Sequence, residues 1–407
     1  MPYTADPLAA ELLPEAAENL AEPRVRGTDV IVAREYDDRW LLVRAVSALG
    51  SAWEWCFGVF SILIGLAILA SIPVVQFLSL GYLLEASARI ARSGRLRDGF
   101  VGIRKAARVG SLVAGTFLML LPLRFISDLW TSAQLIDPAS PATAILRALL
   151  VVLSVLVVAH ILWAWFRGGR LRHFFWPAPI RFLKSLYSGR NLLVQGRDAT
   201  WEFVAGLRLP YYFWLGVRGF FGALAWLFLP IAMLIAASYL NRGPGVLLGL
   251  TGAVLLATVL LYLPFLQTHF ALENRFAAIF ELQAVRRMFR RAPIAYWFAL
   301  LITLAFALPL YLLKIELIPR EAAWIPSLVF VAFAIPARFL TGWAVGRSRR
   351  REKPRFFLSR WLARFAAVPV VLFYVLIVYF TRYFAWHGSL SLFEQHAFLL
   401  PVPFLGQ

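Results

Sequence analysis

The stretch from Trp55 to Leu84 constrains this chain most, because it contains no Asp, Glu, Lys, Arg or His. A helix rises about 1.5 Å per residue and a bilayer core is about 30 Å thick, so about twenty apolar residues suffice to cross it. A basic segment follows directly, with Arg89, Arg92, Arg95 and Arg97. Such a segment anchors the cytoplasmic end of a span. The stretch therefore predicts a transmembrane helix.

Composition excludes a soluble globular domain. Apolar residues make up 61% of the 407 positions and charged residues 15%, whereas soluble domains have about half and about a quarter. The formal net charge is +19, but the basic residues lie in short clusters between apolar runs, which favours contact with the lipid bilayer and its anionic headgroups over nucleic acid. Because Cys56 is the single cysteine, we expect no intramolecular disulfide and no cysteine metal site. We expect no cofactor.

Seven further apolar runs predict an all-α, polytopic transmembrane helical bundle of about eight spans. They cover residues 109–123, 148–166, 211–240, 245–272, 295–313, 322–345 and 365–379. Loops one–two, three–four, five–six and seven–eight hold 7, 8, 5 and 8 Lys and Arg, and the intervening loops and C-terminal tail hold 2, 1, 2 and 1. Basic residues near span ends stay on the inner side, so we expect the four basic loops in the cytoplasm.

Residues 1–50 hold nine acids and five arginines and are expected to form a polar tail, whose second half is compatible with an interfacial helix. One pass through Trp55–Leu84 would place this tail outside. A hairpin broken at Pro73 would keep it inside, since proline removes a backbone donor. We favour one kinked helix, because the same break at Pro264 would place the following basic loop outside.

Three patterns occur twice in the same order. They are Pro73-Val74-Val75-Gln76 and Pro264-Phe265-Leu266-Gln267, then Leu121-Pro122-Leu123 and Leu308-Pro309-Leu310, then Pro179-x2-Phe182-Leu183 and Pro354-x2-Phe357-Leu358. Their common order predicts a four-plus-four parallel duplication, with 51–240 as the first membrane repeat and 241–407 as the second. Transporters are often built from such repeats, with the site at the repeat interface.

Polar residues in apolar runs are the first candidates for a site. Gln76 and Gln267 each follow a proline by three residues, so they are candidates for hydrogen bonds between helices or for a substrate site. Glu85 and Glu273 follow the first and fifth runs, and we expect them to form interfacial pairs with Arg89 and with the nearby arginine 275.

Small and basic residues inside the runs predict packing. Gly216, Gly219 and Gly222 lie on one helical face, which permits close approach of another helix. Arg218 and Arg338 lie within apolar segments. Each could neutralise a buried acid, but we favour snorkelling to the interface.

The basic loops share a tetrapeptide, Gly94-Arg95-Leu96-Arg97 and Gly169-Arg170-Leu171-Arg172. Guanidinium groups suit lipid phosphates. The candidates for headgroup binding are therefore Arg95, Arg97, Arg170, Arg172, Arg181 and Lys184. Membrane anchoring by positive charge explains the same residues without a specific ligand.

Three segments, Gly81-Tyr82-Leu83-Leu84, Ser93-Gly94-Arg95-Leu96-Arg97-Asp98-Gly99 and Leu121-Pro122-Leu123, resemble uncharacterised bacterial multi-pass proteins assigned to domains of unknown function. The resemblance implies an inner-membrane location and a helical fold, and it brings no site residue. No Walker loop, G-x-S-x-G, H-E-x-x-H or dinucleotide turn occurs, so no catalytic residue is assigned. We expect a non-enzymatic integral inner-membrane protein, either a permease-like carrier or an accessory factor that binds anionic lipid. The alternative is a lipid-modifying enzyme with interfacial carboxylates.

Overall fold

The structure is a computed structural model that describes residues 38–176, 178, 180, 192–312, 324–381 and 391–394. The chain divides into two compact units, Met1–Gly50 and Ser51–Gln407. In the first unit the described residues form the beginning of helix α1. The second unit holds the remaining elements, and every element in the described part of the chain is helical.

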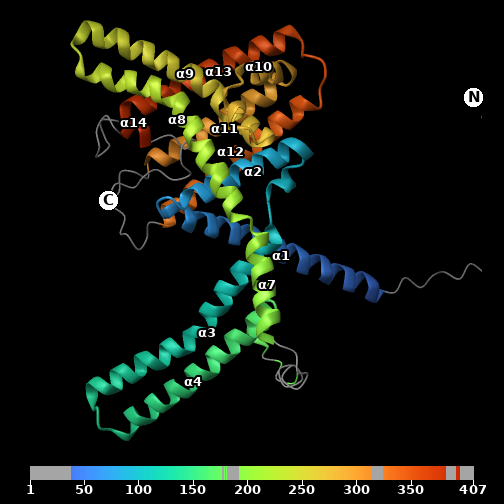
Figure 1. The fold of residues 1–407 in the computed structure, drawn as a ribbon, viewed down its shortest axis with the longest axis vertical. Helices are drawn as coiled ribbons and strands as arrows, with labels where there is room; N and C mark the ends of the chain where they lie inside the picture. The colour runs from blue at the N-terminus through green and yellow to red at the C-terminus, as the bar shows by residue number, and fades with distance from the viewer. Residues whose placement is uncertain are drawn as a thin grey trace, which may run out of the picture. The chain divides into compact units, whose positions relative to one another are not determined.

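Ten helices of the described residues are long: α1 (Asp38–Ser71), α2 (Gln76–Ser93), α3 (Ile103–Ile136), α4 (Pro141–Phe166), α7 (Leu192–Gly206), α8 (Leu209–Tyr239), α9 (Arg242–Glu273), α11 (Pro293–Leu312), α12 (Trp324–Arg349) and α13 (Phe357–Thr381) (Figure 1). The shorter ones are α5 (Leu171–Phe175), α10 (Leu282–Arg291), α14 (Ser391–Glu394) and the 3-10 helices η2 (Leu96–Gly99) and η3 (Phe276–Phe280). Seven helices among the described residues are long and apolar enough to cross a membrane, or eight if α10 and α11, bent by 113°, form one span. The predicted all-α bundle of about eight spans is confirmed.

The long run that opens at Trp55 is divided at Pro73. Helix α1 ends two residues earlier, and residues 72–75 form a turn in which Val74 has a φ of 68°. Helix α2 then begins at Gln76. The expected single kinked helix is therefore wrong. The turn avoids the cost of continuing a helix through proline, about 3 kcal/mol.

Helices α1 and α2 form a hairpin. The hydroxyl of Ser79 on α2 donates to the carbonyl oxygen of Leu66 on α1 at 2.9 Å. At the other end, the ring of Trp55 lies 5.2 Å from that of Phe100, which follows α2. The start of the run and the basic segment after it therefore lie at the same end of the hairpin.

Helix α2 is more enclosed by other helices than α1, although it carries Glu85 and two arginines. It packs against α8, α12 and α9, and twelve of its 18 residues are buried. In contrast, none of the most apolar part of α4 is buried inside the protein. A helix that is shielded from lipid by other helices can carry polar side chains, whereas one that faces lipid cannot.

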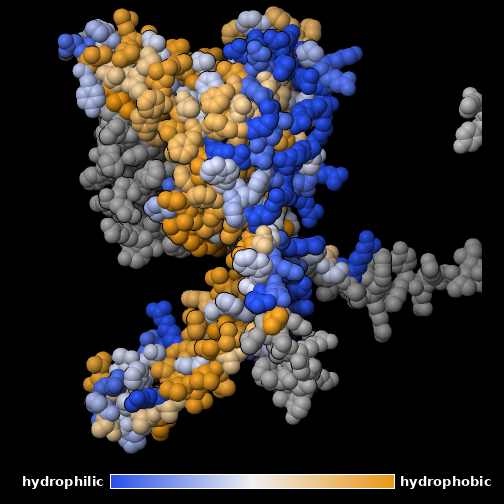
Figure 2. Space-filling model, viewed as in Figure 1, coloured by the Kyte–Doolittle hydropathy of each residue, from blue (hydrophilic) through white to orange (hydrophobic). Residues whose placement is uncertain are grey.

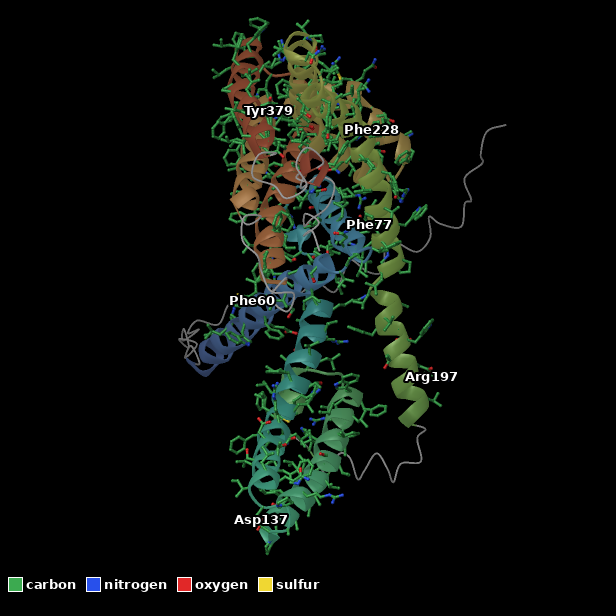
Figure 3. All side chains as sticks on the ribbon, turned by 90° about the vertical axis from the view of Figure 1, so that its left-hand side faces the viewer. Phe60, Phe77, Asp137, Arg197, Phe228 and Tyr379 are labelled. Carbon is green, nitrogen blue, oxygen red and sulfur yellow. The ribbon has the colours of Figure 1, made fainter. Side chains whose placement is uncertain are left out.

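Glycines bring α2 and α8 into backbone contact. A Cβ atom on Gly81 would collide with the carbonyl group of Tyr212, and one on Gly216 would collide with that of Phe77. Phe77 also packs edge-on against Phe220, with ring centroids 5.3 Å apart, and Figure 3 shows it beside α8. The predicted packing face at Gly216 and the two glycines that follow it on α8 is confirmed.

The internal duplication is not shown. Helix α9 continues through Pro264 without interruption, whereas its predicted counterpart Pro73 separates two helices. The first members of the third predicted pair, Pro179, Phe182 and Leu183, lie outside the described residues. A local similarity exists instead: α2 and α9 each end at a left-handed residue, Gly94 and Asn274, and a 3-10 helix follows.

Candidate functional site

Three of the four basic loops meet at one end of the helices, where Nη2 of Arg92 donates to the carbonyl oxygen of Leu272 at 3.4 Å. The guanidinium of Arg349 lies 3.7 Å from Glu273, and the backbone N–H of Arg355 donates to the carbonyl oxygen of Arg290 at 2.9 Å. We call the residues 89–104, 273–291 and 347–364 the basic face. Figure 2 shows hydrophilic residues gathered along the side where α10 lies. That this face is cytoplasmic stays a prediction.

One cavity on the basic face has a volume of about 610 Å³. Its walls come from the α1–α2 hairpin, η2 and the start of α3. The lining residues are Trp55, Arg89, Arg92, Ser93, Arg97, Asp98, Phe100, Ile103 and Arg104. We call it the Trp55 cavity. Only the fold of the hairpin brings Trp55 to the arginines that follow α2.

A buried carboxylate fixes two of the cavity's arginines. The side chain of Glu85 is 5% exposed and accepts a hydrogen bond from Nε of Arg89 at 2.9 Å. Nη1 of Arg92 lies 3.6 Å from the same oxygen, and the hydroxyl of Tyr211 donates to the other oxygen at 2.9 Å. Because Glu85 holds Nε of Arg89, the terminal nitrogens of that guanidinium remain available to the cavity.

The charges around the Trp55 cavity favour an anion. Four arginines and one carboxylate, that of Asp98, line it. Counting also the carboxylate of Glu85, which pairs with Arg89 and Arg92, the excess is two positive charges. The guanidinium of Arg97 lies 5.8 Å from the ring of Trp55, a cation–π contact that restrains it. Arginine forks bind phosphate with short charge-assisted hydrogen bonds. A phosphate group is therefore the ligand chemistry that this cavity fits.

The structure separates the predicted headgroup residues. Arg97 lines the Trp55 cavity, whereas Arg95 is exposed and lines none of the three described cavities. Arg170 and Arg172 lie at α5, also exposed and also outside these cavities. The remaining two candidates, Arg181 and Lys184, lie outside the described residues.

The two predicted glutamines have different surroundings. Gln267 is fully buried on α9, and its amide contacts the carbonyl oxygen of Gly219 at 3.4 Å. Its side-chain oxygen accepts a hydrogen bond from Nη1 of Arg338 at 2.8 Å. Gln76 is buried at the start of α2, and no hydrogen bond joins the two glutamines.

Arg338 does not snorkel, contrary to expectation. The residue is 6% exposed, and within the described part of the chain its hydrogen-bond partner is Gln267. The α9–α12 contact encloses it, so its guanidinium cannot reach the interface. No sequence signal joined these two residues, because they lie 71 positions apart.

The acidic residue at the end of α9 also has a different partner from the one expected. Glu273 pairs with Arg349, while Arg275 pairs with Glu281 at 3.1 Å. Glu281 also contacts Nε2 of His269 at 3.0 Å, and this hydrogen bond, with the nearby positive charge, lowers the pKa of the Glu281 carboxyl. By contrast, the predicted pair of Glu85 and Arg89 is confirmed, although the side chain of Glu85 is buried while that of Arg89 is partly exposed.

Two further cavities on the basic face, of about 460 and 270 Å³, are also lined by arginines. The described residues contain no group of three His, Cys, Asp or Glu that could hold a metal ion. No family model, curated protein or solved structure matches the chain. The site is therefore interpreted from its own geometry.

Proposed function

We propose that this chain is an integral inner-membrane protein that acts as an accessory factor and binds the phosphate group of an anionic lipid in the Trp55 cavity. The observation that carries the proposal is the fixed arrangement of Arg89. Its Nε is held by a buried carboxylate, so its remaining donors are preorganised for an oxyanion. Arg97, restrained by Trp55, supplies a second guanidinium.

The positions of the cavities favour this role over that of a carrier. A carrier needs a site near the middle of the membrane, between its repeats. Each of the three described cavities is lined by arginines, and none of the three includes Gln76 or Gln267. Arginines near the ends of apolar helices are positioned for lipid headgroups.

The first test compares two arginines of the same loop. The purified protein in nanodiscs is assayed by native mass spectrometry for retained phosphatidylglycerol against phosphatidylcholine. A hydrogen bond to a charged group contributes about 1.5–3 kcal/mol, so we expect Arg97→Gln to weaken retention about tenfold or more. Arg95→Gln is the matched control and should change it little. Equal losses in the two variants would refute a specific site.

The second test concerns Glu85, which is a positioning residue. Glu85→Gln adds one unit of positive charge to the region but frees Arg89 to rotate. If preorganisation governs binding, the variant retains less phosphatidylglycerol than the native protein. If net charge alone governs binding, it retains more, and the steepness of the salt dependence rises. The second result would overturn the proposed role.

A carrier for a small anion is the second candidate, favoured by the buried cation of Arg338. An ionisable side chain inside a span marks a substrate path by default. If this candidate is correct, Gln267→Leu should abolish flux of the transported anion in proteoliposomes, because it removes the hydrogen bond that holds Arg338. Gln76→Leu serves as the comparison. Unchanged flux in Gln267→Leu, or no flux of any tested anion in the native protein, would count against it.

The lipid-modifying enzyme stays an untested prediction. Its candidate acids are Glu85, Glu273 and Asp128, and the first two are each bound to arginine.

A further inference from the structure

The second arginine-lined cavity is amphipathic. It has a volume of about 460 Å³ and lies between α9, α10, α11 and α13. Most of its lining side chains are apolar or aromatic, among them Leu261, Phe265 and Leu300. Such walls exclude a small, fully hydrated anion and suit a hydrocarbon chain. We call it the larger cavity, because it is the larger of the two that remain beside the Trp55 cavity.

Three arginines line the larger cavity, namely Arg286 and Arg290 on α10 and Arg364 on α13. No Asp or Glu stands among the described residues that line it. The guanidinium of Arg286 lies 5.6 Å from the ring of Tyr262, and that of Arg364 lies 5.7 Å from the ring of Phe289. Stacking on a ring leaves the N–H edge of a guanidinium free to bind an oxyanion.

A smaller cavity of about 270 Å³ adjoins the larger one and repeats this chemistry. Its arginines are Arg347, Arg351 and Arg355, and the described residues that line it again include no Asp or Glu. Burial lowers the pKa of the Arg351 guanidinium, and the positive charges of its two neighbours add to this effect. Like charges held together without a carboxylate are stabilised by a bound anion.

Two contacts join the cavities. Trp297 lines both of them. The backbone N–H of Arg355, from the smaller cavity, donates to the carbonyl oxygen of Arg290, from the larger one, at 2.9 Å. The indole N–H of Trp297 is buried, and it has no hydrogen-bond partner within the described part of the chain. A donor at this junction, between two groups of arginines, is available to a polar group of a ligand that spans both cavities.

We propose that the two cavities form one site for a lipid with two phosphate groups joined by a short hydroxyl-bearing linker, of the diphosphatidylglycerol type. One phosphate binds the arginines of each cavity, the linker hydroxyl accepts from Trp297, and an acyl chain lies along the apolar wall. The site is separate from the Trp55 cavity, so either proposal can fail while the other stands.

The test uses the full chain in detergent. It is titrated with tetraoleoyl diphosphatidylglycerol or with dioleoyl phosphatidylglycerol, at equal concentrations of phosphate. Native mass spectrometry measures the bound lipid. We expect the native protein to favour the diphosphate lipid about tenfold, because the second phosphate binds without a second loss of translational freedom. Equal affinities at matched phosphate would overturn the proposal.

Variants locate the site. Arg351→Gln in the smaller cavity and Arg290→Gln in the larger one should each reduce the preference to about parity, because each leaves one phosphate weakly held. Arg287→Gln is the matched control, since this arginine is exposed on α10 and lines neither cavity. A loss of preference in Arg287→Gln, or its persistence in both cavity variants, would refute the assignment.

Two further measurements keep the result interpretable if an arginine variant folds poorly. Trp297→Phe keeps the aromatic ring and removes the N–H donor, so it should weaken the diphosphate lipid several-fold and leave the monophosphate lipid unchanged. Arg97→Gln, which alters only the Trp55 cavity, should leave the preference for two phosphates intact. Soluble pyrophosphate in excess should not displace the lipid. Displacement would instead assign the cavities to a free phosphate ligand.

Discussion

Replacing Glu85 by Gln removes a carboxylate that two arginines and a tyrosine share inside the helical bundle. Hydrogen bonds to a charged group contribute about 1.5–3 kcal/mol each, and Glu85 makes two at 2.9 Å. The amide oxygen of Gln can still accept from Tyr211, so one strong interaction is lost. Breaking a fully buried pair costs about 3–5 kcal/mol, but the side chain of Arg89 is 38% exposed. We therefore expect a loss of about 2 kcal/mol.

The matched control is Glu273→Gln, which removes the same group from a looser pair. Glu273 lies 3.7 Å from Arg349, and both side chains are partly exposed, at 35% and 48%. Pairs of this kind contribute about 0–1 kcal/mol. The free energy of unfolding is measured by titration with sodium dodecyl sulfate in mixed micelles, with helix content as the signal. The single variant Arg89→Gln and the double variant Glu85→Gln/Arg89→Gln complete the cycle that isolates the pair's coupling energy.

Two results would refute this reasoning. If Glu85→Gln and Glu273→Gln destabilise the protein equally, burial does not determine the strength of these two ion pairs. If Glu85→Gln leaves the free energy of unfolding unchanged, the network around α2 does not hold the bundle together.

Three further predictions concern packing, topology and pH. Gly81→Ala should destabilise the protein by about 1–3 kcal/mol or more, because the added methyl group meets the backbone of α8. The control is Gly65→Ala, whose methyl group meets nothing within 4 Å, and it should be neutral or stabilising in the same unfolding titration. If the α1–α2 hairpin crosses the membrane twice, residues 51 and 135 lie on opposite sides. In a background without the native cysteine, a membrane-impermeant maleimide should then label Ser51→Cys and Leu135→Cys from opposite sides. Labelling of both from the same side would contradict the hairpin as two crossings. The lowered pKa of Glu281 predicts a contribution to stability that is complete above its ordinary value of 4.5 and is lost as pH falls through the lowered one. The difference in thermal midpoint between the native protein and Glu281→Gln should shrink in acid, and a difference independent of pH would contradict the assignment.

The helical class and the number of spans could be predicted because hydropathy records contact with lipid. The most apolar part of α4 faces outward, and its position was clear in the sequence. Helix α2 is the opposite case, since other helices enclose it and its second half tolerates Glu85 and Arg89. The hairpin at Pro73 was rejected because Pro73 and Pro264 were expected to behave alike, whereas α9 continues through Pro264 and the chain turns at Pro73.

The candidate site could be predicted only in part, because its contacts join distant segments. The pair of Glu85 and Arg89 follows from helical spacing. Tyr211, which completes the network, lies 126 positions from Glu85, and no local pattern connects them. Arg95 and Arg97 were equivalent in the sequence, and only the fold of η2 places one of them in a cavity.

The enclosed position of α2 has a consequence for the biosynthesis of the protein. Its partners α8 and α12 follow it by roughly a hundred residues or more, which a ribosome adds at about 5–20 residues per second. During those seconds the segment that bears Glu85 is already synthesised, but the helices that later shield it from lipid are not. We expect the nascent hairpin to rest at the membrane surface or beside the insertion machinery and to enter the bilayer only when α8 arrives. The Gly81–Gly216 contact would then mark a late step of assembly, so a defect there would expose the chain to quality-control proteolysis before folding is complete.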